Sequence, residues 1–295
     1  MKNLRTIRDL LRFAVTSFNK AGIVHGHGTT SPVDEAAFLI LESLKLPVDD
    51  INPWLDASLT EAERKALLAL FAKRIKTRKP AAYLLKRTYM QGVPFYVDER
   101  VIVPRSYLGE MLAKGLLSDL DIDFSTVHQV LDLCTGSGCL AILAAGHFPM
   151  ADIHATELSK DALAVANINV QEHDLENRIT LHQGDLFAGI GKMKFDFIIA
   201  NPPYVAKGEV DAFPAEYKAE PVMAHLGGKD GFDLVRRILR EAPKHLNTGG
   251  CLLCELGTGG EILEAEFPDL NFMWLDAEDA DGEVFFLRYL SGNKR

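Results

Sequence analysis

Four consecutive residues, Asn201-Pro202-Pro203-Tyr204, combine groups that could hold a planar amide or amine. They follow the apolar run 195–200, which is typical of a buried strand. Neither proline has an N–H and each fixes φ near about −65°, so regular hydrogen bonding must stop there. The sequence therefore predicts a rigid corner at the carboxyl end of a strand, where open α/β sheets bind their ligands. The Asn201 amide, backbone carbonyls without a partner and the Tyr204 ring would line it.

A second stretch suited to ligand binding is the turn Cys134-Thr135-Gly136-Ser137-Gly138, which follows an apolar run. Gly136 and Gly138 allow a tight turn and a close approach of the backbone to a ligand at the start of a helix. Taken alone, such a turn is also compatible with dinucleotide binding or with plain packing of helix on strand. The complete G-x-G-x-x-G pattern is absent, because Cys134 occupies its first position.

Two further predicted strands end in acidic residues. Glu157 ends one of them, and a carboxylate there can accept hydrogen bonds from both ribose hydroxyls. Asp185 follows the next strand and could accept from an exocyclic amine, while Leu186 could cover an adenine face. Four consecutive strand ends thus place groups able to bind a ligand on one edge of a sheet.

These positions are set by alternating strand-like and helical segments, which begin at Val127. Such alternation predicts an α/β fold with a mostly parallel sheet and helices on both faces. Only residues 276–282 separate the last two strand-like runs, which is too short for a parallel crossover, so the final strand should be antiparallel. The predicted strands are 128–133, 151–156, 179–183, 195–200, 250–256, 271–276 and 283–290.

The amino-terminal part of the chain has helical periodicity instead. Helices are predicted from 6 to 22, from the cap at Ser31 to about residue 44, and from the cap at Thr60 onward. We expect a helical domain over residues 1–88, a hairpin connector over 89–105 and an α/β domain over 106–295.

Several polar features of the helical part have a plain and a sharper interpretation. The basic cluster at 73–87 is either a solvated helix face, which we favour, or a docking patch for an acidic protein or ribosomal RNA. His25 and His27 are expected in a solvated glycine-rich loop rather than on a metal. The basic cluster comprises Lys73, Arg74, Lys76, Arg78, Lys79, Lys86 and Arg87. No zinc site is expected around Cys251 and Cys254, which should point to opposite faces of a strand.

Charge and hydropathy restrict the class of protein. Residues 1–105 contain 17 lysines and arginines and 11 acidic residues, a balance of +6, whereas residues 106–295 contain 15 and 30, a balance of −15. The acidic part disfavours stable DNA binding and is compatible with a basic protein partner. No membrane-length apolar run, apolar signal core or P-loop is present, so we predict a soluble cytoplasmic protein that does not hydrolyse nucleotide triphosphates.

The set formed by residues 132–138, Glu157, Asp185 and 201–204 resembles class I S-adenosylmethionine-dependent methyltransferases, specifically the protein-glutamine branch called the HemK family. The likeness covers nearly the whole chain. It includes the stretches 78–84, 95–97, 101–105, 220–221 and 227–231.

This resemblance implies a seven-stranded Rossmann-like sheet, an amino-terminal substrate-docking domain and methylation of a protein glutamine on its side-chain nitrogen. It implies that residues 134–138, Glu157, Asp185 and Asn201 contact S-adenosylmethionine and that residues 201–204 hold the glutamine. We take Leu186 as a further cofactor residue. We take Asn201, Pro202 and Tyr204 as the catalytic residues and expect no metal.

Two branches of the family share this layout. The release-factor branch typically reads Pro-Arg-Pro-Glu-Thr-Glu after the connector, whereas this chain reads Pro104-Arg105-Ser106-Tyr107-Leu108-Gly109-Glu110. That form is similar to the branch acting on the third protein of the large ribosomal subunit, which we favour over a release factor. Whether Pro104 and Arg105 form the edge of a pocket or pack at a domain hinge stays open.

Two other classes of function are weaker alternatives. Adenine-directed methyltransferases use a similar corner on a flipped base, but the acidic balance of the catalytic part disfavours nucleic acid. A non-enzymatic adaptor is disfavoured because every expected site position is occupied by a suitable residue.

Overall fold

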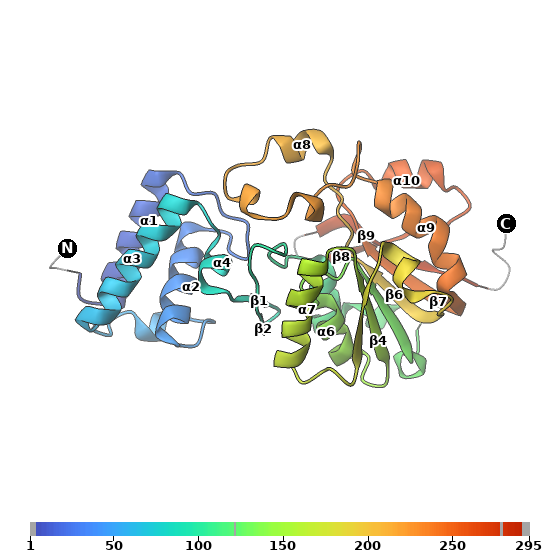
Figure 1. The fold of residues 1–295 in the computed structure, drawn as a ribbon, viewed down its shortest axis with the longest axis horizontal. Helices are drawn as coiled ribbons and strands as arrows, with labels where there is room; N and C mark the ends of the chain where they lie inside the picture. Colours follow the sequence, from blue (N-terminus) through green and yellow to red (C-terminus); the bar gives the residue numbers. More distant parts are fainter. Residues whose placement is uncertain (1–3, 121, 278–279, 291–295) are drawn as a thin grey trace.

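The structure is a computed structural model that describes residues 4–120, 122–277 and 280–290. A helical lobe and a lobe built on a sheet lie next to each other along the longest axis (Figure 1). A segment between β6 (Phe195–Ala200) and α9 (Asp233–His245) lies over the junction of the two lobes. We call residues 205–231 the cover segment; it contains α8 (Lys207–Asp211), η5 (Tyr217–Ala219) and η6 (Val222–Ala224).

The helices of the helical lobe begin and end at residues that satisfy the free backbone groups of a helix terminus. Thr6 and Thr60 form capping boxes, and Ser31 caps a helix whose first residue is proline. Gly22 ends the first helix at φ 58°, a conformation that glycine adopts easily. The helices are α1 (Ile7–Ala21), α2 (Pro32–Leu44), α3 (Glu61–Thr77) and α4 (Ala81–Leu85), with a short turn η1 (Asn52–Trp54). The predicted caps at Ser31 and Thr60 are therefore present.

The four helices of this lobe share one apolar core. Phe18 of α1 and Phe71 of α3 meet edge to face, with ring centroids 5.9 Å apart. Leu39 of α2 is fully buried in the same cluster. Burial of this kind stabilises a side chain by about 1.5–3 kcal/mol.

The connector contains the predicted hairpin, formed by β1 (Thr88–Met90) and β2 (Val93–Phe95). Met90 and Phe95 belong to the core of the sheet lobe, whereas Tyr89 meets Phe38 of α2 edge to face at 6.2 Å. The hairpin thus packs on both lobes.

The sheet has the order β5-β4-β3-β6-β7-β9-β8, and β9 runs antiparallel to both β7 and β8. The predicted seven-stranded sheet with an antiparallel last strand is confirmed. Besides β6, its strands are β3 (Gln129–Leu133), β4 (Asp152–Glu157), β5 (Ile179–Gln183), β7 (Leu246–Glu255), β8 (Met273–Ala277) and β9 (Ala280–Arg288). Leu133 pairs with Ala200, so β3 and β6 end level with each other.

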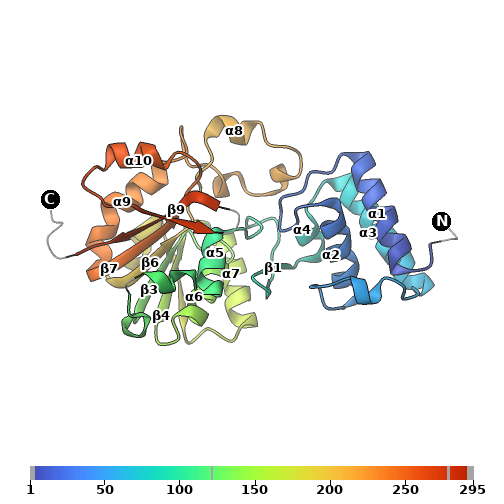
Figure 2. The ribbon, with the colours of Figure 1, turned by 180° about the vertical axis from the view of Figure 1, so that it is seen from behind.

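Helices cover both faces of the sheet (Figures 1 and 2). One core contains Cys251 together with residues of α5 and α6, and the other contains Cys254 together with residues of α9 and α10. The two cysteines therefore face opposite sides of β7, as predicted. The helices not yet given are α5 (Tyr107–Lys114), α6 (Cys139–His147), α7 (Lys160–Glu172) and α10 (Gly260–Glu266), with the 3-10 turns η2 (Leu116–Asp119), η3 (Phe124–Thr126) and η4 (Leu186–Ile190).

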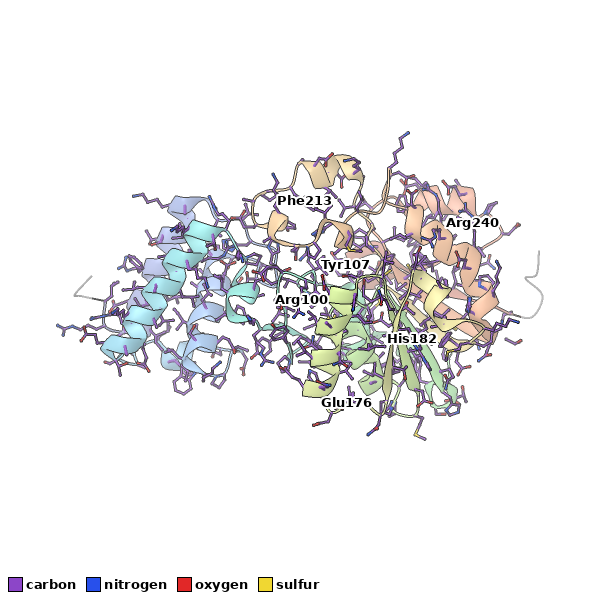
Figure 3. The ribbon with its side chains drawn as sticks, in the orientation of Figure 1. Arg100, Tyr107, Glu176, His182, Phe213 and Arg240 are labelled. Atoms are coloured by element: carbon purple, nitrogen blue, oxygen red, sulfur yellow. The ribbon has the colours of Figure 1, made fainter. Side chains whose placement is uncertain are left out.

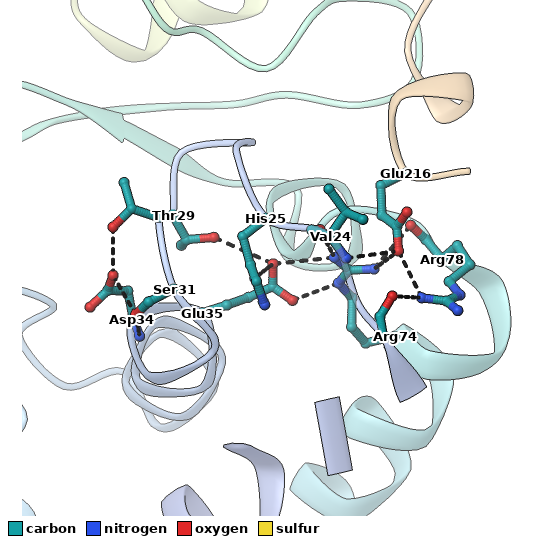
Figure 4. Close-up of polar contacts among 11 residues, drawn as sticks. Val24, His25, Thr29, Ser31, Asp34, Glu35, Arg74, Arg78 and Glu216 are labelled. Carbon is teal, nitrogen blue, oxygen red and sulfur yellow. Dashed lines mark hydrogen bonds and ion pairs between the residues drawn. The ribbon is translucent and has the colours of Figure 1, made fainter. Parts of the chain in front are cut away.

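The basic cluster is only partly solvated, and the favoured solvated-face interpretation is wrong for Arg74. Arg74 is fully buried, and its Nε lies 2.6 Å from Oε1 of Glu35 (Figure 4). Arg78 donates to Glu216 of the cover segment at 2.9 Å. Lys79 pairs with Glu99 and Arg87 with Glu172, whereas Lys73 and Lys76 are exposed.

The glycine-rich loop before α2 was expected to be solvated, but its two histidines contact other parts of the protein. His25 places Nδ1 3.3 Å from Oε2 of Glu35, and His27 is 3% exposed against the Tyr217 ring. Among the residues that the structure describes, no three His, Cys, Asp or Glu side chains come together as a metal site. None of the helices in the described ranges combines the length and apolar character that crossing a bilayer requires.

The buried Arg74–Glu35 pair generates a stability prediction. Replacing Arg74 with methionine leaves the Glu35 carboxylate buried without the guanidinium that pairs with it, which should lower the unfolding free energy by about 3–5 kcal/mol. Lys73→Met, one residue away on the exposed face, should change it by less than about 0.5 kcal/mol. Urea denaturation of both variants measures the difference, and equal stability losses would contradict the importance of the pair.

Candidate active site

A cavity of about 310 Å³ lies at the carboxyl ends of β3 and β6. Its walls come from the turn at 134–137, the corner at 201–204, the stretch 104–106 and parts of the cover segment. Figure 3 shows Phe213, one of its lining residues, on the cover segment. The structure thus brings the turn and the corner, predicted from separate motifs, to one cavity.

The glycine turn is shaped by residues in the left-handed region: Cys134 at φ 60°, Gly136 at φ 57° and Gly138 at φ 82°. A Cβ on Gly138 would lie 3.3 Å from that of Ala166 in α7, a tight contact on a backbone that L residues rarely adopt, so glycine is strongly favoured there. A Cβ on Gly136 would meet nothing nearer than the Cys134 carbonyl oxygen at 4.0 Å. The outer face of the turn is therefore open to a ligand.

Glu157 lies directly beside this turn. Its Oε2 accepts the Gly136 N–H at 2.9 Å, and its Oε1 accepts the Ser159 N–H at 2.8 Å. The carboxylate is therefore held at the end of β4, next to the open face of the turn.

Asp185 and Leu186 follow β5, at the far end of the row of parallel strand ends β5-β4-β3-β6. Asp185 is exposed and accepts a hydrogen bond from Nη2 of Arg237 at 3.0 Å, a partner that its sequence position did not suggest. The Leu186 side chain is 4% exposed and packs in the core that contains α9. Gly138, Glu157, Asp185 and Leu186 do not line the cavity itself.

The corner presents the groups that its sequence predicted. No described residue donates a hydrogen bond to the half-buried Asn201 side chain, and none of the described backbone N–H groups reaches the Pro202 carbonyl. The backbone of the corner is held by a loop of the cover segment. A Cβ on Gly227 would lie 2.7 Å from the Pro203 carbonyl oxygen, and one on Gly231 would overlap the Tyr204 carbonyl oxygen, so only glycine fits at either position.

The Tyr204 hydroxyl donates to Oε1 of Glu255 at 3.2 Å. Glu255 is 1% exposed at the end of β7, and its Oε2 accepts the Ser106 hydroxyl at 2.6 Å and the Tyr107 N–H at 2.9 Å. Burial raises the pKa of Glu255 to about 7, although these hydrogen bonds oppose the rise. Sequence analysis missed this residue, because an acid inside an apolar strand gives no signal of its partners.

A second buried carboxyl, that of Asp132, stabilises the glycine turn at 134–138. Asp132 is completely buried and its Oδ2 accepts the Thr135 hydroxyl, while burial raises the pKa of Asp132 to about 7. Its Oδ1 has no hydrogen-bond partner in the described part of the chain.

Arg105 lines the edge of the cavity and also packs at the junction of the lobes. Both roles that the sequence left open, pocket edge and domain-hinge packing, therefore apply to Arg105. Its Nη1 and Nη2 donate to Oε1 and Oε2 of Glu220 at 2.9 and 2.8 Å. Glu220 also accepts the Val103 N–H at 2.8 Å, and its Oε2 lies 3.0 Å from Nε2 of His225. Burial alone would raise the pKa of Glu220, but Arg105 and His225 hold it at about 2.

Comparisons with known proteins identify the class. The family model described as "Methyltransferase small domain" matches residues 112–216. A methyltransferase from Pyrococcus furiosus superposes with a TM-score of 0.51 at 18% identity, covering 78% of this chain and 100% of that chain. The hMettl16 catalytic domain, solved with MAT2A 3'UTR hairpin 6, gives 0.52 at 16% identity over 78% and 82%. The fold is thus the one that these methyltransferases share.

Curated relatives identify the family within that class. A ribosomal protein uL3 glutamine methyltransferase of Bradyrhizobium diazoefficiens is 54% identical over 96% of this chain and 91% of its own length. Proteins of the same name from Neisseria meningitidis and Burkholderia pseudomallei are 50% and 48% identical, over 97% and 96% of this chain and 94% of their own lengths. The chain belongs to the family of ribosomal protein uL3 glutamine methyltransferases, and the resemblance drawn from its motifs is confirmed.

Burial of Glu255 predicts a pH-dependent stability. Because its pKa in the folded protein, about 7, lies above the ordinary 4.5, the folded state binds the proton more tightly, and the unfolding free energy falls as pH rises from about 4.5 to 7. Between pH 5 and pH 8 this contribution is about 2–3 kcal/mol. Glu255→Gln should remove it, as urea titrations at both pH values can measure. Glu261→Gln, on the exposed side of α10, is the control and should keep the wild-type difference; the same difference in Glu255→Gln would refute the assignment.

Proposed function

We propose that this protein transfers the methyl group of S-adenosylmethionine to the side-chain amide nitrogen of a glutamine in ribosomal protein uL3. The observation that carries this proposal is 46–54% identity, over nearly the whole chain, to relatives named for that activity. The open amide and carbonyl of the corner, next to an open glycine turn, support it chemically.

An amide nitrogen is a poor nucleophile, because its lone pair is delocalised into the carbonyl. In the proposed mechanism the Asn201 side-chain oxygen accepts one N–H of the glutamine amide and the Pro202 carbonyl accepts the other. Both bonds orient the nitrogen, and positioning of this kind lowers a barrier by about 7–11 kcal/mol at best. The cofactor, when bound, supplies a methyl group on a positively charged sulfur. The amide proton leaves after transfer, when the nitrogen is far more acidic.

Tyr204 has a positioning and water-excluding role in this proposal. Its ring lines the cavity, and its hydroxyl is fixed by the buried Glu255. Pro203 keeps the corner extended, since its ring fixes φ.

The cofactor residues proposed here lie along the row of parallel strand ends. The turn at 134–138 would hold the amino-acid part of S-adenosylmethionine, next to Asn201. Glu157 would accept the ribose hydroxyls, and Asp185 and Leu186 would lie at the adenine. The donor set fits, because carboxylates follow the two strands beyond an open turn.

We further propose that residues 1–88 form a domain that docks the acceptor protein and that residues 106–295 form the catalytic domain. Residues 89–105 would connect the two domains. The separate core of the four amino-terminal helices supports the first boundary. We also propose that the reaction takes place in the cytoplasm, since the proposed acceptor is a ribosomal protein. A release factor or an adenine amino group is the alternative acceptor, and the names of the relatives favour neither.

Removing the Asn201 amide tests the mechanism. At saturating cofactor, Asn201→Ala should lower kcat for uL3 methylation by about 10²–10³-fold, as loss of a comparable oriented hydrogen bond does in other enzymes. Calorimetry should still detect cofactor binding. Asn247→Ala, which removes an exposed amide on β7, is the control. Near wild-type turnover of Asn201→Ala would exclude the proposed role.

The acceptor itself can be identified by labelling. Incubating the protein with methyl-labelled cofactor and an extract of cells that lack this enzyme should label uL3, and peptide mass spectrometry should place the methyl on a glutamine side chain. Label on a release factor, or on nucleic acid, would replace the proposed acceptor.

A further inference from the structure

A second groove, of about 350 Å³, lies on the helical lobe next to the connector. Its apolar lining comes mainly from α2, including Val33, Phe38 and Leu41. The stretch 48–51 and the start of β1 close its sides. No step of the proposed reaction uses this groove.

Three carboxylates stand along the groove: Asp34, Asp49 and Asp50. None of the residues that line it is a lysine or an arginine, although residues 1–105 carry a balance of +6. The hydroxyls of Ser31 and Thr30 hold the pKa of Asp34 below its usual range, so this carboxylate is ionised at neutral pH. The bonds that Asp50 accepts from Asn52 go to Oδ1 and leave Oδ2 for a ligand.

His27 lines the groove, and its ring packs against Tyr217 of the cover segment. This lining residue is 3% exposed, and neither ring nitrogen has a hydrogen-bond partner among the described residues. Nε2 lies 3.6 Å from Oε2 of Glu220, which is too far for a good hydrogen bond. Burial lowers the pKa of His27 to about 4, so the ring is neutral at pH 7 and keeps one nitrogen as an acceptor. The neutral ring therefore adds no positive charge to the lining of the groove.

Two contacting side chains separate the groove from the cavity of about 310 Å³ at the ends of β3 and β6, which would take the glutamine and is called the acceptor cavity below. The His27 ring centroid lies 4.2 Å from that of Tyr217, and Tyr217 lines the acceptor cavity. Glu220 lies in the same layer, between His27 and Arg105. The groove and the acceptor cavity are therefore adjacent within the fold.

We propose that this groove binds a lysine or arginine side chain of the acceptor protein, on a segment close to the methylated glutamine. The inference rests on the proposed function and adds a specificity site to it. The aliphatic stem of such a side chain would pack on Phe38 and Leu41, and its cation would meet the three carboxylates. A ribosomal protein suits the site, because proteins that neutralise RNA phosphates are rich in lysine and arginine.

The double variant Asp49→Asn/Asp50→Asn tests the groove, since both residues are exposed and lie outside the proposed catalytic machinery. With purified uL3 as acceptor, its KM should rise by about three- to tenfold, the range expected for two exposed ion pairs. Its kcat and the calorimetric affinity for S-adenosylmethionine should not change. The dependence of kcat/KM on salt should become shallower, because fewer charges are paired on binding.

The matched control is Asp56→Asn/Glu61→Gln, which removes the same charge from exposed positions of the helical lobe outside the groove. An equal KM for the two double variants would overturn the groove proposal while leaving the methyltransferase function intact. A wild-type enzyme that methylates no glutamine of uL3 would overturn the proposed function and the groove with it.

Discussion

The enclosure of the cavity at the ends of β3 and β6 depends on the ion pair and hydrogen bonds that the Glu220 carboxylate makes. It lies in the cover segment, yet it binds Arg105 and the Val103 N–H of the connector and lies near His27 of the helical lobe. A charge with a fully buried side chain is tolerated only with such partners, because desolvation of an unpaired carboxylate costs several kcal/mol. The same bonds that satisfy this charge therefore fix three distant segments around one cavity, with Arg105 at its edge.

The sequence predicts the features that depend on a few neighbouring residues. Helix caps such as Ser31, the succession of strands and helices along the chain, and the row of groups at the carboxyl ends of the strands follow from patterns of a few residues. The rigid corner at 201–204 follows from covalent geometry, since proline lacks an N–H. The turn at 134–138 meets it because parallel strands that end level must bring their carboxyl ends together. These parts of the fold and the candidate site could be read without coordinates.

The features that were missed are pairings between segments far apart in the chain. Glu220 and Arg105 are 115 positions apart, and Arg74 and Glu35 are 39 apart, so no local pattern relates them. A cluster of basic residues then looks like a solvated surface, although its central arginine is fully buried. Counting charges gives the electrostatic balance of a segment, but which charges face solvent depends on tertiary contacts. Glu255 was missed for the same reason.

The double anchoring of the cover segment has a consequence for which glutamines can react. Glu216 joins this segment to Arg78 of the helical lobe, and four residues later Glu220 joins it to the connector. Both carboxylates are almost completely buried, so lifting the segment would break two ion pairs at once. The cavity of about 310 Å³ that this segment helps to line therefore resists widening. Under the proposed function, such a cavity would admit a single extended side chain more readily than a folded surface. Accessibility of the glutamine in the acceptor, as much as the sequence around it, would then select the residue that reacts.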